Sequence, residues 1–421
     1  MQICINDHDV DEFIGIINQI AQDHPILVDK YIVGKEIEVD AVCDGTDILI
    51  PGIMEHIERT GIHSGDSISV YPAPSITPSI EAKLVDYTEK LARALHVKGM
   101  INIQFIVCGE DVYVIEVNPR ASRTVPYISK VTGIPMVDLA ARAMLGESLS
   151  EMGYQTGLAP ASEYYAVKVP VFSFEKIADA NTIMGPEMKS TGEVLGLGKN
   201  MQEALFKGLV SAGYKVEKET RGGVLISVNH RDQPEIVNIA RKLDEMGYKL
   251  YATDGTAREI SRLGTDVEIV GKLGKDNRVF QLLENGRIDY VILTGSTEPI
   301  YIRDFIHLNH RCVQLGIPCL TSLDTANALT DILASRYNQR NTELIDICHL
   351  RSERQKLKFS KLQTCGNDYI FLENFHGEIT CPESLCVTFC DRHYGIGADG
   401  IVLMEHSDIA DAKIRLFNAD G

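Results

Sequence analysis

The sequence predicts a multidomain chain of α/β and α+β character, because three stretches show three different patterns. Residues 1–215 mix amphipathic helices with short strands that end at Gly and Asp turns. Residues 222–350 alternate apolar strands with helices, which is typical of a doubly wound parallel sheet. Residues 357–421 follow a polar, basic segment and are rich in Cys and Gly. We therefore expect three domains with these boundaries.

The composition is that of a globular protein with 421 residues, of which 44% are hydrophobic and 24% are charged. A net charge of −18 argues against binding to nucleic acid or to anionic membrane surfaces. No apolar run approaches the roughly 18 residues that span a bilayer, and the acidic N-terminus lacks the features of a signal peptide. Ten dispersed Cys residues predict reduced thiols and a cytoplasmic location.

The first stretch is expected to contain strands at 26–31, 36–43 and 47–53 and a helix at 79–95. Thr77-Pro78 supplies a cap and a first-turn proline for this helix. Its apolar residues recur at helical spacing: Ile80, Leu84, Tyr87, Leu91 and Leu95. Two further strands, 100–107 and 112–117, flank a turn and predict a hairpin.

The hairpin carries the clearest chemical signal in this stretch. Side chains alternate along a strand, so Glu116 and Asn118 share one face. A three-residue loop at 109–111 would pair Cys108 with Val112 and would place Gln104 opposite Glu116. Three oxygen-bearing side chains in one patch suit Mg²⁺, which keeps waters and bridges phosphates. The alternative is an ordinary polar face exposed to solvent, and the spacing alone leaves both interpretations open.

Three long segments resemble the second ATP-grasp module of the carbamoyl-phosphate synthase large subunit. They are IEVNPRASRTVPYISKVTGIP, IMEHIERTGIHSGDS (53–67) and MGPEMKSTGEVLGLG (184–198), and they follow one another in the order of the family. The resemblance covers about residues 1–350 and implies an ATP-grasp domain that lacks its N-terminal part. Arg120 and Arg123 follow the hairpin and could stabilise charge on a transferring phosphoryl group, so they are the candidate catalytic residues.

The resemblance also implies the cofactors and their ligands. Gln104, Glu116 and Asn118 would hold Mg²⁺ or Mn²⁺. The residues that would contact ATP are Lys30, Ile32, Glu36, Gly61, Ile62, His63, Ser64, Gln104 and Glu116. Lys30 and the short Val33-Gly34-Lys35 segment depart from the family pattern beside the adenine. The implied reaction is phosphorylation of carbamate by ATP, which gives carbamoyl phosphate for pyrimidine and arginine biosynthesis.

A complete large subunit has a second ATP-grasp half, which activates bicarbonate, and a glutamine amidotransferase small subunit as its partner. We therefore expect this chain to keep the metal hairpin and to need the missing large-subunit half and that partner for the full reaction. The alternative is a regulatory module that binds a nucleotide effector without catalysis.

The second stretch is expected to have strands at 224–228, 249–252, 267–270, 290–293 and 318–320 and helices at 235–246 and 256–263. Thr256 and Glu259 predict a capping box for the second helix. Polar loops follow the strands, and helix N-termini at such loops attract anions, although ordinary turn chemistry explains any single loop. The stretch resembles the methylglyoxal-synthase-like regulatory domain of the same synthase. This implies an allosteric nucleotide such as UMP, with these contacts: Thr253, Gly255, Thr256, Lys272 and Thr294.

The last stretch contains KFSKLQTCGNDYIFLENF (358–375) and CDRHYGIGADGIVLM (390–404), which resemble the start of diaminopimelate epimerase, an enzyme of lysine biosynthesis. This resemblance implies a truncated α+β segment with substrate contacts at Asn367 and Asn418. Both catalytic cysteines of that enzyme would lie beyond the chain, so epimerase activity is not expected, and Cys365 is not a candidate catalyst. The remaining thiols and histidine fit no zinc spacing: Cys381, Cys386, Cys390 and His393.

Overall fold

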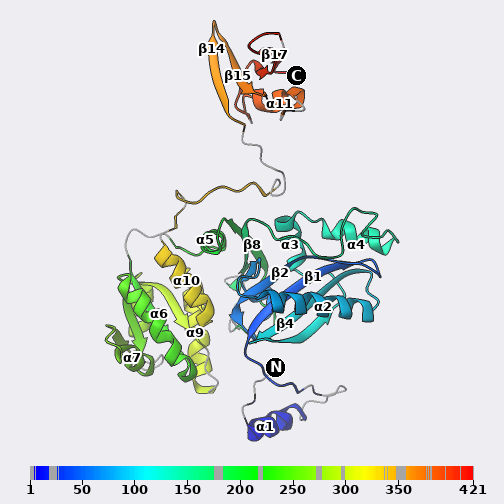
Figure 1. Cartoon of the computed structure of the whole chain (residues 1–421). Coiled ribbons are helices and arrows are strands. Elements are labelled where there is room, and N and C mark those ends of the chain that lie inside the picture. Colours follow the sequence, from blue (N-terminus) through cyan, green and yellow to red (C-terminus); the bar gives the residue numbers. More distant parts are fainter. Residues whose placement is uncertain are drawn as a thin grey trace. The chain divides into compact units, whose positions relative to one another are not determined.

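The computed structural model divides the chain into two compact units, Met1–Arg351 and Ser352–Gly421 (Figure 1). The structure describes residues 4, 6–18, 26, 28–174, 184–216, 221–271, 277–294, 299–335, 337–338, 340–347, 357–375, 377, 379, 382–393, 395–407 and 409–420. Across these ranges, no helix has both the length and the apolar character needed to traverse a bilayer.

The first sheet of the first unit has eight strands in the order β5-β4-β1-β2-β3-β7-β8, with β6 paired to β2. Its strands are β1 (Lys35–Cys43), β2 (Ile48–Arg59), β3 (Ser69–Tyr71), β4 (Gly99–Cys108), β5 (Asp111–Asn118), β6 (Gly157–Leu158), β7 (Tyr165–Val171) and β8 (Gly192–Gly198). The pairs along the main path are antiparallel, and β2 and β6 are parallel. The strands expected at 36–43, 47–53, 100–107 and 112–117 are confirmed.

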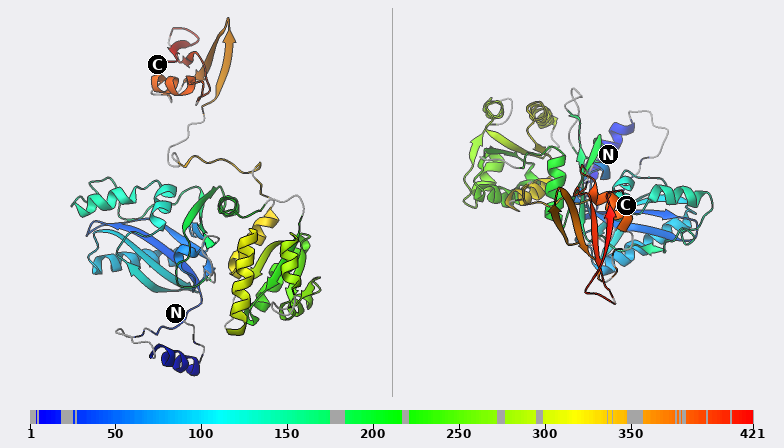
Figure 2. Two further views of the ribbon diagram at one scale, coloured as in Figure 1. Left: turned by 180° about the vertical axis from the view of Figure 1, so that it is seen from behind. Right: turned by 90° about the horizontal axis from the view of Figure 1, so that it is seen from above.

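Helices cover both faces of this sheet (Figure 1 and Figure 2). They are α2 (Pro78–Ala94), α3 (Thr124–Thr132), α4 (Met136–Met144) and α5 (Met201–Ser211), whereas the N-terminal helix α1 (Asp7–Asn18) has no buried residue. The apolar side of α2 packs on one face of the sheet, and α3 and α4 pack on the opposite face. The Thr77 side chain accepts a hydrogen bond from the Ile80 amide at 3.3 Å, so the predicted N-cap of α2 is confirmed.

Two expectations for this region are wrong. The described part of 26–31 forms no strand: Val28 and Tyr31 are exposed, and the Tyr31 hydroxyl donates to the Thr60 carbonyl at 2.9 Å. An extended segment without a neighbouring strand has no ladder in which to pair its backbone groups. In the hairpin, Cys108 pairs with Asp111 rather than Val112, so the loop has two residues.

The second sheet of the first unit is parallel throughout, in the order β11-β10-β9-β12-β13, which confirms the doubly wound prediction. Its strands are β9 (Gly223–Ser227), β10 (Lys249–Thr253), β11 (Glu268–Val270), β12 (Ile288–Leu293) and β13 (Cys319–Leu320). The helices are α6 (Gln233–Glu245), α7 (Asp254–Ser261), α8 (Arg278–Glu284), α9 (Pro299–Leu315) and α10 (Leu323–Ser335). Helices α6, α7 and α10 cover one face, and α8 and α9 cover the other.

The predicted capping box of α7 is wrong. The helix begins at Asp254, and Thr253 occupies the N-cap position without a side-chain cap bond. Thr256 lies in the first turn, where its hydroxyl accepts a hydrogen bond from the Val228 amide at 3.3 Å. The hydroxyl therefore connects α7 to the end of β9 instead of capping its own helix.

The second unit is a four-stranded sheet in the order β14-β15-β16-β17 with one helix. Its elements are β14 (Phe359–Thr364), β15 (Asn367–Glu373), α11 (Pro382–Cys390), β16 (Gly400–Glu405) and β17 (Lys413–Asn418). Only the β15–β16 pair is parallel within this described sheet. The unit has its own buried core, which includes Ile370, Leu372, Cys386 and Leu403.

Candidate functional site

A β-bulge sets the register of the β4–β5 hairpin. The two-residue loop would by itself place Gln104 opposite Ile115. The register instead shifts between Gln104 and Phe105, so that Gln104 pairs with Glu116. An extra residue of this kind moves the following side chains to the other face of the strand. The predicted pairing is therefore confirmed, although the predicted loop is not.

The three predicted metal ligands meet at one oxygen. Glu116 Oε1 accepts hydrogen bonds from Gln104 Nε2 at 3.0 Å and from Asn118 Nδ2 at 2.8 Å. Rotation of each amide by half a turn would direct an oxygen toward the same point. One carboxylate and two amide oxygens form a hard donor set of the kind that Mg²⁺ accepts together with water and phosphate. In the described part of the chain, no cluster of three or more His, Cys, Asp or Glu could hold a metal, so the amides are essential to this candidate.

The turn after β2 connects this hairpin to the predicted nucleotide contacts. A short 3-10 turn, Ser64–Asp66, begins at His63, whose Nδ1 accepts a hydrogen bond from the Gly65 amide at 3.0 Å. Gln104 Nε2 donates to Ser64 Oγ at 3.1 Å. The buried Lys168 of β7 donates to the Ser64 carbonyl at 2.9 Å. The structure therefore brings His63 and Ser64 to the hairpin from a distant part of the sequence.

One of the two predicted catalytic arginines also lies near this turn. Arg123 Nη1 donates to the Ser190 carbonyl at 3.4 Å, and the Ser190 amide donates to Asp66 at 2.8 Å. Arg120 is exposed, and its guanidinium donates a hydrogen bond to the neighbouring Ala121 carbonyl at 3.1 Å. The structure thus joins Arg123, but not Arg120, to the turn.

Three of the remaining predicted nucleotide contacts lie together, and the other two do not join them through the hydrogen bonds of the described residues. The Gly61 amide donates to Glu36 Oε1 at 3.2 Å, and the Thr60 hydroxyl donates to the Ile32 carbonyl at 2.9 Å. Glu36, Gly61 and Ile32 therefore lie together, whereas the Lys30 side chain is exposed. Ile62, the residue after Gly61, lines a cavity described below.

Sequence reasoning predicted Glu36 but missed the row of buried ionisable side chains to which it belongs on β1. Glu36, Glu38 and Asp40 alternate along the strand and are 1–6% exposed. His56 of β2 bridges the first two, with each ring nitrogen 3.2 Å from a carboxylate oxygen. Asn102 donates to Glu38 at 2.8 Å and to Asp40 at 2.9 Å. The signal in the sequence was the recurrence of acids at every second residue of a predicted strand.

The charges in this row depend on one another. Burial alone would lower the pKa of His56, but its hydrogen bonds to Glu36 and Glu38 and their charges raise that pKa to about 9. Burial would raise the pKa of Glu38, but the hydrogen bond and charge of His56 outweigh it and lower that pKa to about 2. Burial and the charge of Glu38 together raise the pKa of Asp40 to about 6. At neutral pH the row therefore contains a protonated His56 beside an ionised Glu38.

The same row positions the loop that carries the arginines. Asp40 accepts hydrogen bonds from the Ser122 hydroxyl at 2.7 Å and from the Thr124 hydroxyl at 2.5 Å. These two residues flank Arg123. The buried carboxylate thus fixes the backbone on both sides of the predicted catalytic side chain.

The predicted effector residues lie at the carboxyl ends of the parallel strands. The Ser227 and Thr253 hydroxyls are 3.1 Å apart, and the Asn229 amide donates to Thr294 Oγ1 at 2.8 Å. Thr256 is 1% exposed, so its hydroxyl stabilises the loop rather than facing solvent. Gly255 is exposed at the start of α7, and Lys272 lies outside the described residues.

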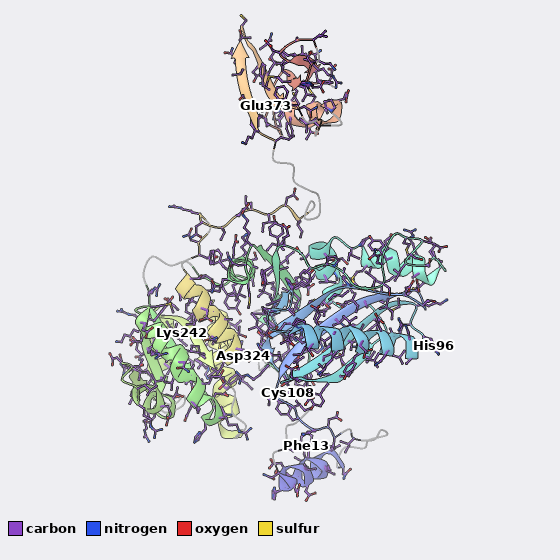
Figure 3. The ribbon with its side chains drawn as sticks, in the orientation of Figure 1. Phe13, His96, Cys108, Lys242, Asp324 and Glu373 are labelled. Atoms are coloured by element: carbon purple, nitrogen blue, oxygen red, sulfur yellow. The ribbon has the colours of Figure 1, made fainter. Side chains whose placement is uncertain are left out.

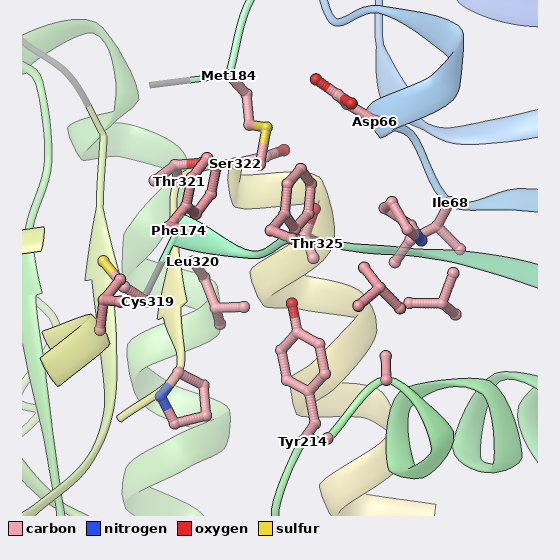
Figure 4. Close-up of a pocket in the computed structure, with 18 of the residues that line it drawn as sticks. Asp66, Ile68, Phe174, Met184, Tyr214, Cys319, Leu320, Thr321, Ser322 and Thr325 are labelled. Atoms are coloured by element: carbon pink, nitrogen blue, oxygen red, sulfur yellow. The ribbon is translucent and has the colours of Figure 1, made fainter. Parts of the chain in front are cut away.

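A cavity of about 430 Å³ lies between the two sheets of the first unit (Figure 4). Its lining combines apolar side chains with the buried carboxylates of Glu58 and Asp66. Tyr214 also lines it, and burial together with the charge of Glu58 raises the pKa of this phenol to about 12. Sequence analysis did not predict this cavity.

In the second unit, the predicted contacts Asn367 and Asn418 lie at the same end of the sheet. Asn418 pairs with Gly400, which also pairs with Tyr369, two residues after Asn367. Both asparagines are exposed. Cys386 and Cys390 are buried with their sulfur atoms 3.7 Å apart, and Cys381 lies outside the described residues.

Comparison with known proteins agrees with the two sheets of the first unit. Residues 1–152 match the family "Carbamoyl-phosphate synthase L chain, ATP binding domain", and residues 235–321 match the MGS-like domain family. The carbamoyl phosphate synthase large chain of Agathobacter rectalis is 52% identical over 356 residues, which are 84% of this chain and 33% of that protein. The large chain of Lachnoclostridium phytofermentans is 54% identical over 353 residues, which are 83% of this chain and 33% of that protein.

Among solved structures, the biotin carboxylase domain of a single-chain bacterial carboxylase is 24% identical with a TM-score of 0.30, over 33% of this chain and 32% of that chain. The chain spans about a third of the length of the curated relatives that it matches. Residues 1–152 thus carry a carbamoyl-phosphate synthase L chain ATP-binding domain and residues 235–321 an MGS-like domain, and over most of its length the chain is homologous to part of a carbamoyl phosphate synthase large chain.

Proposed function

We propose that residues 28–198 bind ATP with a divalent metal ion and transfer its terminal phosphoryl group to carbamate, which gives carbamoyl phosphate. The observation that carries the proposal is the meeting of Gln104, Glu116 and Ser64. These residues come from separate strands and a turn, yet Gln104 Nε2 lies 3.1 Å from Ser64 Oγ and 3.0 Å from Glu116 Oε1. Homology to carbamoyl phosphate synthase large chains supports the same reaction.

The residues of the site have distinct roles in this proposal. A divalent ion such as Mg²⁺ or Mn²⁺ supplies positive charge beside the phosphates when it is bound. Glu116 contributes the negative charge of the donor set, and the amides of Gln104 and Asn118 contribute neutral oxygens. Arg123 and, after rotation of its exposed side chain, Arg120 would offset negative charge on the transferred group. Glu36 would accept hydrogen bonds from the ribose, and Lys30, Ile32 and 61–64 would complete the nucleotide contacts.

Further proposals follow from the large-chain relatives, because the chain spans only part of their length. The full synthesis of carbamoyl phosphate for pyrimidine and arginine biosynthesis would need a bicarbonate-activating half and a glutamine amidotransferase subunit. The second sheet would bind an anionic effector such as UMP near Thr253 and Thr294, where polar groups of neighbouring loops converge. For the second unit, the likeness to diaminopimelate epimerase stays a prediction.

The reverse partial reaction tests the catalytic proposal without the missing components. Purified full chain is incubated with carbamoyl phosphate, ADP and Mg²⁺, and ATP formation is measured by luciferase luminescence. Glu116→Gln is expected to lower the rate at least about tenfold, because the donor set loses its only negative charge. Glu110→Gln, in the loop of the same hairpin, is the matched control and should leave the rate unchanged. Absence of ATP formation by the wild-type chain with either Mg²⁺ or Mn²⁺ would refute autonomous catalysis.

A further inference from the structure

A buried lysine lies on the same sheet face as the candidate metal ligands. Lys168 of β7 is 1% exposed. It pairs with Ser69 of β3, which in turn pairs with His56 of β2, and paired residues of neighbouring strands point to the same face. His56 contacts Glu38, which pairs with Gln104. The lysine and the metal hairpin therefore share one face, although four strands of sheet separate β7 from β5.

The ammonium group of this lysine binds the backbone of the turn after β2. Lys168 Nζ donates to the Ser64 carbonyl at 2.9 Å, and the same carbonyl accepts a longer hydrogen bond from the Ser67 amide at 3.4 Å. The lysine also acts on buried acids through its charge: burial raises the pKa of Glu193, and the charge of Lys168 opposes that rise. Removal of an ammonium group from water is costly, and here the buried charge fixes one backbone group of the turn.

The side chain of Ser64 continues this path to the donor set. Gln104 Nε2 donates to Ser64 Oγ at 3.1 Å and to Glu116 Oε1 at 3.0 Å. Gln104 lies on β4, whose last residue, Cys108, is labelled in Figure 3. A hydroxyl both donates and accepts, so Ser64 can hold the Gln104 amide in its present orientation and also after the half-turn that would direct its oxygen to an ion.

The residues on both sides of Ser64 are held by a different segment of the chain. The His63 amide donates to the Gly185 carbonyl at 2.8 Å, and the Gly65 carbonyl accepts a hydrogen bond from the Ser190 hydroxyl at 3.0 Å. The buried lysine binds the residue between them. The position of the Ser64 hydroxyl therefore depends on the ammonium group as well as on these flanking contacts.

We propose that Lys168 is a positioning residue for the metal site: through the Ser64 carbonyl it holds the Ser64 hydroxyl where that hydroxyl orients the Gln104 amide. The proposal rests on the proposed metal site. Groups that hold a metal ligand in place, without touching the ion, commonly change metal affinity by about 10- to 100-fold. Loss of the ammonium group should therefore weaken metal binding although Lys168 is no ligand itself.

The variant Lys168→Met tests this proposal in the full chain, because it removes the charge and keeps a long unbranched side chain. Lys207→Met is the matched control: Lys207 also donates to a backbone carbonyl, that of Leu197 at 2.7 Å, but lies on α5, which packs on the opposite face of β7. Ser64→Ala removes the hydroxyl and keeps the carbonyl that the lysine binds. If circular dichroism shows Lys168→Met to be unfolded, Lys168→Gln replaces it, since its amide reaches less far than the lysine nitrogen.

Two measurements separate metal binding from the order of the turn. The Kd of Mn²⁺ is measured by electron paramagnetic resonance. Without metal, hydrogen exchange is measured for the Gly65 and Asp66 amides, which donate to His63 at 3.0 and 2.8 Å. Lys168→Met is expected to speed exchange of both amides about tenfold, because the turn loses the contact at its centre.

Lys168→Met and Ser64→Ala are each expected to weaken Mn²⁺ binding about tenfold. Because both break the same path, Lys168→Met added to Ser64→Ala should weaken binding by less than about twofold more. Lys207→Met should remain within about twofold of wild type in both measurements.

A lysine that only stabilises the fold would weaken Mn²⁺ binding by the same factor with and without Ser64→Ala, and that result would overturn the proposal. Equal Mn²⁺ affinity in Lys168→Met and wild type would overturn it as well. If the wild-type chain binds no Mn²⁺, the proposed metal site fails. The exchange measurement then still decides whether Lys168 holds the turn, and equal exchange in Lys168→Met and Lys207→Met would show that it does not.

Discussion

His56 offers a quantitative test of the buried row on β1. Its ring is 1% exposed, and both ring nitrogens lie 3.2 Å from carboxylate oxygens of Glu36 and Glu38. The variant His56→Gln keeps a polar group of similar length but removes the positive charge. The buried Glu38 carboxylate would then lose its hydrogen-bonded cation and keep only the charge of Lys168, which is costly in a medium of low dielectric constant.

The magnitude follows from the pKa of His56, which rises from 6.5 to about 9 in the folded chain. Because each pH unit corresponds to about 1.4 kcal/mol, protonation of His56 stabilises the fold by roughly 3 kcal/mol. The folded-state pKa is the higher one, so this stabilisation is fully present below pH 6.5 and is lost as the pH rises through 9. Asp40, with a pKa of about 6, is already ionised over most of this window and adds little slope there.

The assay compares the free energy of unfolding at pH 7 and pH 9.5 by urea titration. Circular dichroism is the suitable probe because the chain contains no Trp, and hydrogen exchange of β1 amides reports on the first unit separately. Between these pH values, wild type and the control His8→Gln, an exposed residue of α1, should each lose roughly 2 kcal/mol more than His56→Gln does, because the stabilisation is no longer complete at pH 7 and is almost gone at pH 9.5. An unchanged pH dependence in His56→Gln would refute the assignment of the proton to this ring.

Three further results are expected. Thr77→Ala should lower the free energy of unfolding by about 1 kcal/mol in urea titration, because α2 loses its N-cap. Gly196→Ala should destabilise the fold by more than about 2 kcal/mol, since its Cβ would lie 2.0 Å from a backbone carbonyl oxygen of α5, whereas Gly192→Ala on the same strand meets nothing within 4 Å and should be tolerated. Asn118→Ala should weaken Mn²⁺ binding about tenfold by electron paramagnetic resonance, and Asp111→Asn at the start of the same strand should not.

Elements with local signals were predictable from the sequence. The Thr77-Pro78 start of α2 and the alternation of strands and helices in the second sheet needed no tertiary information. The pairing of Gln104 with Glu116 was also predicted, but through a loop that is one residue too long. The loop is one residue shorter than predicted, and the bulge adds one residue to β5, so the predicted pairing still forms. Bulges depend on how a strand bends over its neighbours, so no local pattern in the hairpin could reveal it.

Two features depend on contacts between distant segments. Acids at every second position of a strand are typical of a solvent face, and only the packing of α3 shows that Glu38 and Asp40 are buried. Thr256 has the spacing of a capping residue, yet its hydroxyl binds the Val228 amide at the end of a neighbouring strand. In both cases the local pattern indicated one role for the side chain, and a contact with a distant segment gave it a different role.

The buried ionisable residues near the candidate site also stabilise the fold, whereas the exposed proposed metal ligand Glu116 does not. Glu38, Asp40 and His56 are buried: His56 binds Glu38, and Asn102 donates to both Glu38 and Asp40, so replacement of any of the three changes stability and site geometry together. Glu116 is exposed at the edge strand β5, and its partners Gln104 and Asn118 retain access to water when it is replaced. A loss of metal-dependent chemistry in Glu116→Gln can therefore be attributed to the donor set. A similar loss in an Asp40 variant reports on the loop around Arg123 as well, because Asp40 binds Ser122 and Thr124 on both sides of that arginine.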